Sequence, residues 1–535
     1  MDSDNQKNIE SMDLTVQEIA SACGGRLVRK EDGAGDNRVR SVVIDSRKVE
    51  EGSVFVATLG ERVDGHSFIA SAYAKGAVLA VTQKTPEQVA GETGQDTSCW
   101  GDYLLVEDTL EALRAMAEYY RQKVGIPVVG ITGSVGKTST KECIAGVLAE
   151  KYTVWKTEGN YNNTIGVPLT LLGIRPCHQV AVVEMGISDF GEMHLLSRMA
   201  RPNVCVITNI GQSHLETLGS REGILQAKSE IFDYMAPDGE ICLNAEDDIL
   251  CTLEEIRGRK PHFFGLGRVP WSITEASHTA GFKKLIRDPF QPKEDPPVDT
   301  SPIQEVSALD IVHRGLKGSD ATLYILRDGK MTRFPVHMPL PGRHMVLNAA
   351  AAACVATLFQ VTPEQIQEGI RKLTAVDGRS HIIKLDNFTI IDDCYNANPA
   401  SMKVGLDILA QEEAPTRRTA ILGDMFELGE DSVRLHEEVA EYAVETGIEH
   451  IIFVGEQARH MFRAADRKIG IGRRGELVQH IYQYPTVEDC IEDLAVDAEY
   501  FFQKGCTILL KASHGMEFTK ILDFLKSIPA LPEFR

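Results

Sequence analysis

The chain has 535 residues, with 56 lysines and arginines against 77 aspartates and glutamates, giving a formal charge of −21. This length predicts several domains, and the negative charge argues against general nucleic-acid binding. Hydrophobic residues make up 43% of the chain and charged residues 25%. Both values are close to the globular average, so we expect ordinary buried cores and no wholesale disorder.

The cysteines and the first residues indicate a compartment. Eleven cysteines are scattered without any CxxC pair, which is typical of reduced thiols and not of a disulfide framework. The opening segment, MDSDNQKNIESMD, lacks the basic and apolar parts of a secretory signal, and no uncharged apolar run reaches about 18 residues. We therefore expect a cytoplasmic protein without membrane insertion, and a monomer.

Secondary-structure patterns change along the first half of the chain. Between Leu14 and about Val124 they predict a small mixed unit, with helices at LTVQEIASACGG and DTLEALRAMAEYYRQ and strands at RSVVID and VFVATL. Beyond it, strands are predicted at 126–132, 180–186 and 204–210, with helices from Lys137 and near 191–200. This alternation of strand and helix is typical of a parallel sheet.

The second half begins with a proline-rich segment at about 268–305, which we interpret as a surface excursion because proline does not fit a central strand. An alanine-rich helix is predicted from near Asn348. A second alternating series has strands at FTIIDD, TAILGDM, HIIFVGE and CTILLKAS, and helices from Pro399, at 431–446 and at 486–504. We predict three α/β domains: a small mixed domain (1–124), a central P-loop domain with a parallel sheet (125–376) and a C-terminal Rossmann-like domain (377–535).

A glycine-rich loop between a strand and a helix is the strongest single signal, and it reads Thr132-Gly133-Ser134-Val135-Gly136-Lys137-Thr138-Ser139. Glycines let backbone N–H groups turn toward phosphate, and the helix N-terminus adds partial positive charge. Lys137 suits the β- and γ-phosphates of ATP, and Thr138 suits Mg²⁺. Position 131 is isoleucine, so the first glycine of the general motif is missing.

Three other polar residues follow strands or lie on a nearby helix. Glu184 ends the strand VAVVE, where a carboxylate could bind Mg²⁺, and His214 follows the next strand, within reach of a metal or phosphate. Lys228, in QAKSEIF, is predicted from its own pattern to be an exposed lysine. A phosphate loop alone does not separate a kinase, a nucleotide switch and a ligase.

These motifs together resemble the Mur ligase family. The segments that carry the resemblance are GITGSVGKTSTKE (130–142), NYNNTIGVPLTLL (160–172), VEMGISDFGEM (183–193), TNIGQSHLETLGS (208–220), AKSEIF (227–232), LPGRHMVLNAAAA (340–352), DDCYNANPASM (392–402) and LGDMFELG (422–429). The family's loop is similar to T-G-[ST]-x-G-K-[TS], which accounts for the missing glycine. The form YNANPASM is closest to the branch of the family that uses D-Ala-D-Ala.

The resemblance implies an ATP-dependent amide ligase of peptidoglycan precursor synthesis. It would join D-Ala-D-Ala to UDP-N-acetylmuramoyl-tripeptide through an acyl phosphate, giving the pentapeptide precursor, ADP and phosphate. The N-terminal domain would bind the UDP-sugar peptide through Ser46 and Arg47, and Asn163 and Thr164 would face the muramoyl part. The C-terminal domain would close over ATP and bind the amine.

The resemblance also implies roles for single residues around ATP and Mg²⁺. Thr138, Glu184 and His214 would bind Mg²⁺, and Lys228 would join them if carbamylated, because a carbamate is an anion. The catalytic set would be Lys137, Lys228 and His214.

Further residues would contact the nucleotide or the amine. His344 and Asn348 would border the adenine, and Arg379 would reach the phosphates after domain closure. Asp393 and Tyr395 would contact the ribose and base. Residues after the last strand would line the dipeptide site, namely Lys511, Ser513 and His514.

Two alternatives stay open. One is a related Mur or folylpolyglutamate-type ligase with another amine, which would accept free amino acids in place of the dipeptide. The other is a P-loop nucleotide switch without ligation, which would hydrolyse ATP independently of the UDP-sugar and the amine.

Overall fold

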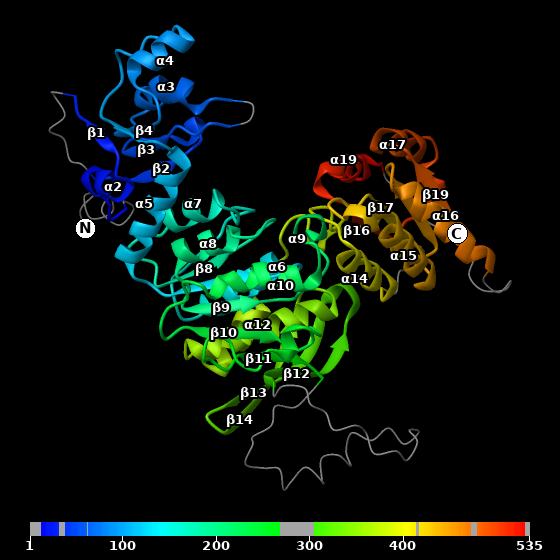
Figure 1. The fold of residues 1–535 in the computed structure, drawn as a ribbon. Helices are drawn as coiled ribbons and strands as arrows, with labels where there is room; N and C mark the ends of the chain where they lie inside the picture. Colours follow the sequence, from blue (N-terminus) through cyan, green and yellow to red (C-terminus); the bar gives the residue numbers. More distant parts are fainter. Residues whose placement is uncertain are drawn as a thin grey trace. The chain divides into compact units, whose positions relative to one another are not determined.

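The computed structural model describes residues 12–30, 38–60, 63–267, 304–412, 417–471 and 479–529. Contacts divide the chain into two compact units: Met1–Thr132 with Lys151–Val206 and Ala227–Ile241, and Gly133–Glu150 with Ile207–Gln226 and Cys242–Arg535. The strands form three sheets, so the predicted α/β class is confirmed (Figure 1). Most of the predicted proline-rich excursion (268–303) lies outside the described residues. No helix in the described ranges has both the length and the apolar character to cross a membrane.

The N-terminal sheet has the strand order β1-β5-β4-β3-β2. Its strands are β1 (Arg26–Val28), β2 (Ser41–Val43), β3 (Ser53–Val56), β4 (Leu79–Thr82) and β5 (Tyr103–Leu105), and only β1 pairs antiparallel. The helices of this region are α2 (Val16–Cys23), α3 (Ile69–Ala74), α4 (Pro86–Thr93) and α5 (Thr109–Val124). The predicted strands RSVVID and VFVATL are β2 and β3. The other three strands, β1, β4 and β5, were not predicted. They are as short as β2 and β3, and so few residues give only a weak periodic signal.

Side-chain caps fix where several helices begin. The Thr15 hydroxyl accepts from the backbone N–H of Glu18 in a capping box that starts α2, and Asp108 accepts from two backbone N–H groups at the start of α5. Asn398 caps α14 (Pro399–Ala410), with Pro399 in the first turn. This confirms that the Asn-Pro pair begins a helix.

The central sheet has nine strands in the order β14-β13-β12-β11-β10-β9-β6-β8-β7. They are β6 (Val128–Thr132), β7 (Val154–Lys156), β8 (Val180–Glu184), β9 (Val204–Ile207), β10 (Glu240–Asn244), β11 (His262–Leu266), β12 (Gln304–His313), β13 (Ser319–Arg327) and β14 (Lys330–Met338). β6 and β7 each pair parallel with β8, whereas β12, β13 and β14 form an antiparallel extension. The three strands predicted here are therefore confirmed as β6, β8 and β9.

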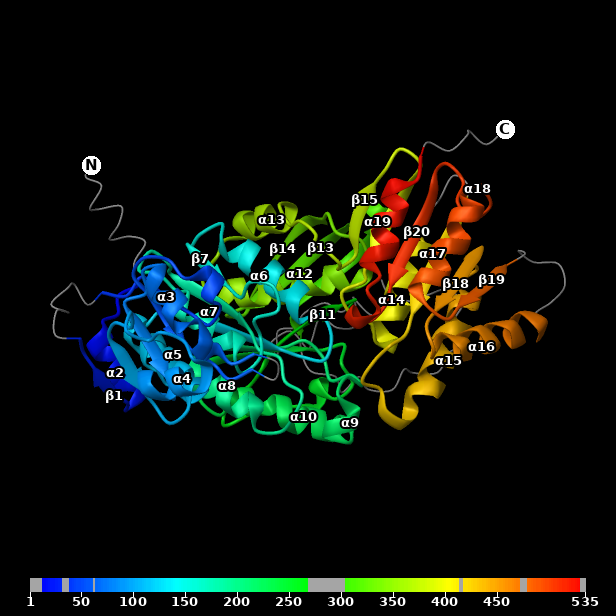
Figure 2. The same cartoon turned by 90° about the horizontal axis from the view of Figure 1, so that it is seen from above.

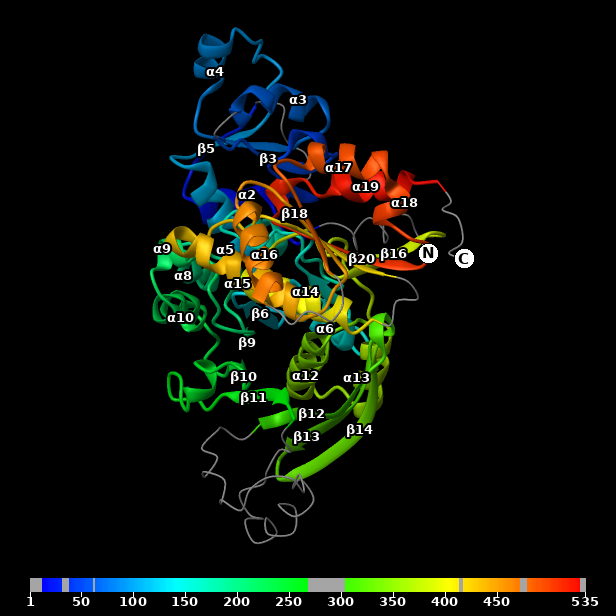
Figure 3. The ribbon, with the colours of Figure 1, turned by 90° about the vertical axis from the view of Figure 1, so that its right-hand side faces the viewer.

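The helices of the central region are α6 (Lys137–Leu148), α7 (Gly166–Leu172), α8 (Glu192–Ala200), α9 (Leu215–Leu218), α10 (Arg221–Ser229), α12 (Arg343–Leu358) and α13 (Pro363–Arg371). α12 contacts β12, and α13 contacts β14 (Figure 3). α12 begins at Arg343, ahead of the predicted Asn348. The helix starts there because Gly342, with φ 99, is the last residue outside helical geometry.

The C-terminal sheet has the order β15-β16-β20-β17-β18-β19. Its strands are β15 (His381–Lys384), β16 (Phe388–Asp392), β17 (Arg418–Gly423), β18 (His450–Val454), β19 (His480–Tyr484) and β20 (Cys506–Lys511), all parallel except β15. The other helices are α15 (Ser432–Glu445), α16 (Ala458–Ile471), α17 (Val487–Val496), α18 (Ala498–Phe501) and α19 (Thr519–Ser527). The predicted helix 486–504 is two helices, because Asp497 leaves helical geometry and caps α18.

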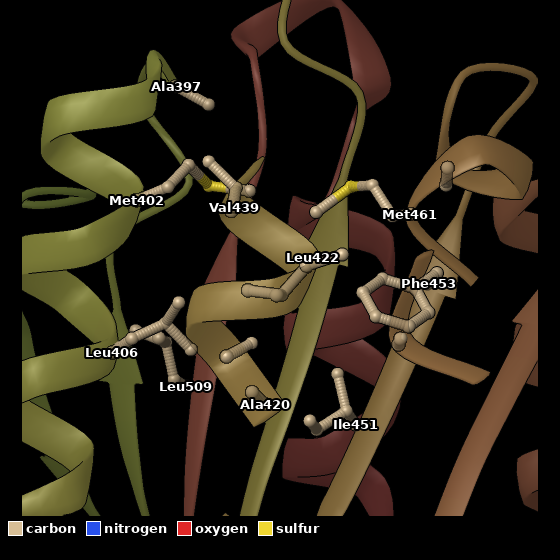
Figure 4. Close-up of a cluster of buried hydrophobic side chains, with 14 of the residues drawn as sticks. Ala397, Met402, Leu406, Ala420, Leu422, Val439, Ile451, Phe453, Met461 and Leu509 are labelled. Atoms are coloured by element: carbon tan, nitrogen blue, oxygen red, sulfur yellow. The ribbon is translucent and has the colours of Figure 1, made fainter. Parts of the chain in front are cut away.

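Two apolar layers cover the two faces of this sheet. Side chains of α14, α15 and α16 cluster on one face with Leu422 and Phe453, and side chains of α17, α18 and α19 cluster on the other with Ile421. Figure 2 shows these two groups of helices on the two sides of the sheet. Adjacent strand residues point to opposite faces, so a strand covered on both faces is apolar throughout. Figure 4 shows Leu422 amid the first cluster.

Leu422→Ala should destabilise the C-terminal sheet by about 3 kcal/mol, because the leucine is fully buried and its removal leaves a cavity. Native-state hydrogen exchange should register this as roughly a hundredfold faster exchange of β17 amides. Val433→Ala is the control, since Val433 is 41% exposed in α15. Equal exchange in the two variants would contradict the assignment of Leu422 to the core.

Candidate functional site

The phosphate loop joins β6 to α6, and its shape depends on two glycines. The backbone angle φ is 148° at Gly133 and 81° at Gly136, and residues other than glycine rarely adopt such values. A Cβ atom at position 133 would also overlap the Thr208 hydroxyl. Position 133 therefore requires glycine on both grounds.

Two residues that follow β9 hold the loop in place. The Val135 carbonyl accepts from Thr208 Oγ1 at 2.7 Å and from Asn209 Nδ2 at 2.9 Å. The Val135 N–H donates to Asn209 Oδ1 at 2.9 Å, and the Ser134 N–H donates to the Asn209 carbonyl at 3.0 Å. Asn209 was not among the predicted site residues. The signal that could have found it is an amide side chain directly after a strand that neighbours β6.

Positive charge gathers where the loop enters α6. Lys137 Nζ donates to the Gly133 carbonyl at 2.9 Å, and Thr138 is buried in the first helical turn. A helix N-terminus presents backbone N–H groups and partial positive charge. The turn has no side chain at its two glycines, so a phosphate chain fits this cradle in shape and in charge.

The predicted adenine pair lies on α12. His344 is half-buried, and desolvation, helped by the charge of Lys511, lowers its pKa to about 4, so the ring is neutral at pH 7. Its Nδ1 has no hydrogen-bond partner within the described part of the chain. Asn348 Oδ1 accepts from Thr140 Oγ1 of α6 at 3.1 Å. Asn348 is thereby joined to the helix that follows the phosphate loop.

The residues predicted to contact ATP from the C-terminal region lie close together. The Arg379 guanidinium stacks over the Tyr395 ring, 4.3 Å from its centroid, and that ring also contacts His514. Asp393 forms an ion pair with Lys511 at 2.6 Å. Arg379 lies in the turn before β15, whereas Asp393 and Tyr395 follow β16, and Lys511 and His514 lie at the end of β20. The carboxyl ends of β16 and β20 lie side by side in the sheet. This is where ligands bind in open α/β sheets.

Glu184 ends β8 with a fully buried carboxylate. Its side chain accepts from Asn162 Nδ2 at 2.8 Å, and its backbone N–H donates to Thr157 Oγ1 at 3.0 Å. Asn162 is a second residue that sequence reasoning missed, one position before the predicted Asn163. Its amide fixes the orientation of the carboxylate.

Lys228 is buried, with 1% exposure, so the sequence-based expectation of an exposed lysine is wrong. It shares a buried stripe with Ile224, Ala227 and Ile231, at the spacing of one helical face. The lysine pattern alone did not show that position 228 belongs to this stripe.

His214 precedes α9 in a left-handed conformation, with φ 63. Its Nδ1 lies 3.2 Å from Glu427 Oε2, and this contact lowers the pKa of Glu427. The described ranges contain no cluster of three or more His, Cys, Asp or Glu side chains able to hold a metal. Of the predicted Mg²⁺ ligands, only Glu184 and His214 are of those residue types. The oxygens of Thr138 and Glu184 are of the kind that Mg²⁺ prefers.

The predicted substrate residues of the N-terminal region, Ser46 and Arg47, lie in a 3-10 turn, Ser46–Lys48, that Asp45 caps. The Arg47 guanidinium binds both carboxylate oxygens of Asp45, and these bonds lower the pKa of Asp45 to about 2. The Arg47 side chain is 87% exposed. Arg47 is therefore accessible to an anionic ligand.

The second predicted substrate segment adjoins this turn. Lys48 Nζ donates to the Tyr161 hydroxyl at 3.1 Å, next to Asn163 and Thr164 in the chain. Asn163 Oδ1 accepts from the backbone N–H groups of Ile165 and Gly166, and the Thr164 carbonyl accepts from Arg114. Asn163 thus shapes the loop that begins α7.

Asn209→Ala should weaken nucleotide binding by roughly tenfold or more, because it removes two side-chain hydrogen bonds that shape the loop. Fluorescent-nucleotide titration measures this effect, and the melting temperature reports any loss of fold. The control is Gln17→Ala, which removes an exposed amide side chain from α2. Unchanged affinity in Asn209→Ala would contradict its role in holding the loop.

Comparison with known proteins places the whole chain in one family. Three family models match: "Mur ligase family, catalytic domain" at 38–121, "Mur ligase middle domain" at 131–279 and "Mur ligase, glutamate ligase domain" at 378–514. A Bacillus subtilis protein named UDP-N-acetylmuramoyl-tripeptide–D-alanyl-D-alanine ligase is 32% identical over 96% of this chain and 99% of its own length. An Escherichia coli protein of the same name is 32% identical over 96% and 98%.

Solved structures agree with the sequence matches. A MurF crystal structure from Acinetobacter baumannii superposes with a TM-score of 0.78 at 27% identity, covering 97% of this chain and all of its own. A Thermotoga maritima MurF ligase in complex with ADP gives 0.68 at 26% identity, covering 91% and 97%. The predicted three-domain architecture is confirmed by these likenesses. The chain belongs to the Mur ligase family.

Proposed function

We propose that this chain is an ATP-dependent amide ligase that joins D-alanyl-D-alanine to UDP-N-acetylmuramoyl-tripeptide in peptidoglycan precursor synthesis. The observation that carries the proposal is the match, over nearly the full length of both chains, to relatives named for that reaction. The phosphate loop supports the ATP part independently of the names. The products are the pentapeptide precursor, ADP and phosphate.

The reaction needs ATP because a carboxylate is a poor electrophile. In the proposed mechanism, the terminal carboxylate of the tripeptide attacks the γ-phosphorus of ATP, the bond to ADP breaks, and an acyl phosphate forms. The amine of D-Ala-D-Ala then attacks the acyl carbon. The tetrahedral intermediate loses phosphate, and a proton leaves the former amine, which gives the amide.

Lys137 and the N-terminus of α6 oppose the charge of the triphosphate in this proposal. The chain carries a net charge of −21, so its overall field does not attract the triphosphate, the substrate carboxylate or the acyl phosphate. Local groups must therefore supply the compensation. Arg379, Asp393 and Tyr395 would act on the nucleotide from the C-terminal region, and His344 and Asn348 from α12.

Mg²⁺ is part of the proposal, with Thr138, Glu184, His214 and a carbamylated Lys228 as its ligands. The metal would neutralise charge on the transferring phosphoryl group. A buried ammonium is costly, and carbamylation would turn Lys228 into an oxygen-bearing anion suited to a divalent cation.

The domain roles follow the predicted boundaries. Residues 1–124 would bind the UDP-sugar peptide through Ser46 and Arg47, with Asn163 and Thr164 from the central domain facing the muramoyl part. Residues 125–376 would bind ATP, and residues 377–535 would close over ATP and bind the amine. We propose that the chain works as a monomer in the cytoplasm, where its nucleotide substrates occur.

Phosphate release from ATP and Mg²⁺ should require both UDP-N-acetylmuramoyl-tripeptide and D-Ala-D-Ala, and mass spectrometry should detect the pentapeptide product. Single amino acids, omission of either substrate and removal of Mg²⁺ by EDTA are the comparison arms. Phosphate release without either substrate and without product would support a nucleotide switch. Product formation with a free amino acid would favour a related ligase.

Lys137→Ala should lower turnover by at least about a hundredfold, because the ammonium stabilises charge that develops on the phosphates. Its melting temperature should stay near that of the wild type. The matched control is Lys151→Ala, which removes a lysine in the turn after α6. Ligation at the wild-type rate in Lys137→Ala would refute the role of this residue.

A further inference from the structure

A buried lysine ends the central strand of the C-terminal sheet. Lys511 is the last residue of β20, between β16 and β17, and only 1% of it is exposed. Its stem packs on α14, where a Cβ added to Gly405 would lie 3.2 Å from Lys511 Cδ. A charged side chain this deeply buried requires compensating partners.

The ammonium of Lys511 has three acceptors, all in the loop that follows β16. Nζ donates to Asp393 Oδ2 at 2.6 Å, to the Asn396 carbonyl at 3.2 Å and to the Asp393 carbonyl at 3.5 Å. An ammonium has three N–H donors. The three donors are thus committed to the loop.

Asp393 passes this constraint on to the turn that contains Arg379. Its Oδ1 accepts from the Ser380 N–H at 3.1 Å, while its Oδ2 holds the ammonium. The same turn is bonded at a second point, where the Tyr395 N–H donates to the Gly378 carbonyl at 3.1 Å. Arg379 lies between these two bonds and stacks on Tyr395.

Neighbouring bonds make the turn rigid with respect to β16. The Gly378 N–H donates to Asp392 Oδ2 at 3.2 Å, and the Arg379 N–H donates to the Val376 carbonyl at 3.0 Å. Gly378 and Ser380 both have positive φ, 70 and 49. Ser380 adopts a conformation that is unfavourable for its residue type, so the turn depends on these external bonds.

We propose that Lys511 is a positioning residue for the nucleotide: through Asp393 its buried ammonium holds the turn 376–380, and with it Arg379, in one geometry. The inference rests on the proposed function only for the statement that Arg379 meets the phosphates of ATP. The mechanical part, from Lys511 to the turn, stands on the bonds above. The turn therefore belongs structurally to the C-terminal sheet.

Hydrogen exchange read by mass spectrometry tests the mechanical part without any activity. In Lys511→Met, peptides covering 376–381 should exchange at least about tenfold faster than in the wild type, and Lys511→Arg should restore part of the protection. Lys520→Met is the matched control, because Lys520 is half exposed on α19 and pairs with Glu488 at the surface. If Lys511→Met does not fold, Asp393→Asn replaces it, since it removes the same ion pair and keeps the side-chain size.

Steady-state kinetics on the same variants tests the link to the nucleotide. Lys511→Met should raise KM for ATP by about tenfold, while KM for D-Ala-D-Ala stays within about twofold. Unchanged exchange at 376–381 would overturn the proposal, and so would a rise in KM for the dipeptide alone. A wild-type enzyme that does not ligate would instead refute the proposed function and leave the exchange result to decide the mechanical part.

Discussion

The phosphate loop depends on the close approach of two side chains, those of Thr208 and Asn209, to its backbone. Gly133 has no side chain, so Thr208 and Asn209 can reach the loop and hold the carbonyl of Val135. The end of one strand thus sets the shape of the loop that leaves another. Because parallel strands bring such ends to the same edge of a sheet, residues more than 70 positions apart in the chain build one cradle.

Charge is the second constraint on this molecule. A protein of net charge −21 that handles a nucleotide and a carboxylate must concentrate positive charge where these groups meet. The helix end at α6, Lys137 and the guanidinium of Arg379 are suited to that task. The charge of Lys511 has a different use, because its buried ammonium pairs with Asp393 and holds the loop after β16.

Strongly patterned features of this chain could be predicted from the sequence. Several strands of the central and C-terminal sheets, such as β6 and β17, are apolar runs of five or six residues, and helices with capping residues, such as Asn398 before Pro399, were placed correctly. The short strands β1, β4 and β5 were missed, whereas β2 and β3 of the same length were found, because three or four residues give only a weak periodic signal. The split between α17 and α18 was missed because Asp497 leaves helical backbone geometry without a glycine or proline to mark the break in the sequence.

Some residues of the candidate site could be predicted from the sequence, and others could not. The glycine-rich loop could be predicted from the sequence, because a phosphate cradle needs its glycines and its lysine at this spacing. Asn209 and Asn162 were missed because they act on neighbours across the fold, and such pairing is not visible along the chain. The burial of Lys228 was missed because a single lysine on an amphipathic helix is usually solvated. The roles assigned to the other site residues stay predictions.

In the proposed reaction, the γ-phosphoryl group of ATP passes to the tripeptide carboxylate. The most direct test uses UDP-N-acetylmuramoyl-tripeptide labelled with ¹⁸O in its terminal carboxylate, together with unlabelled ATP and D-Ala-D-Ala. An acyl phosphate keeps one carboxylate oxygen on phosphorus when the amine displaces phosphate. We therefore expect one ¹⁸O atom in each phosphate released, with the pentapeptide as co-product. Unlabelled phosphate released alongside that product would contradict it.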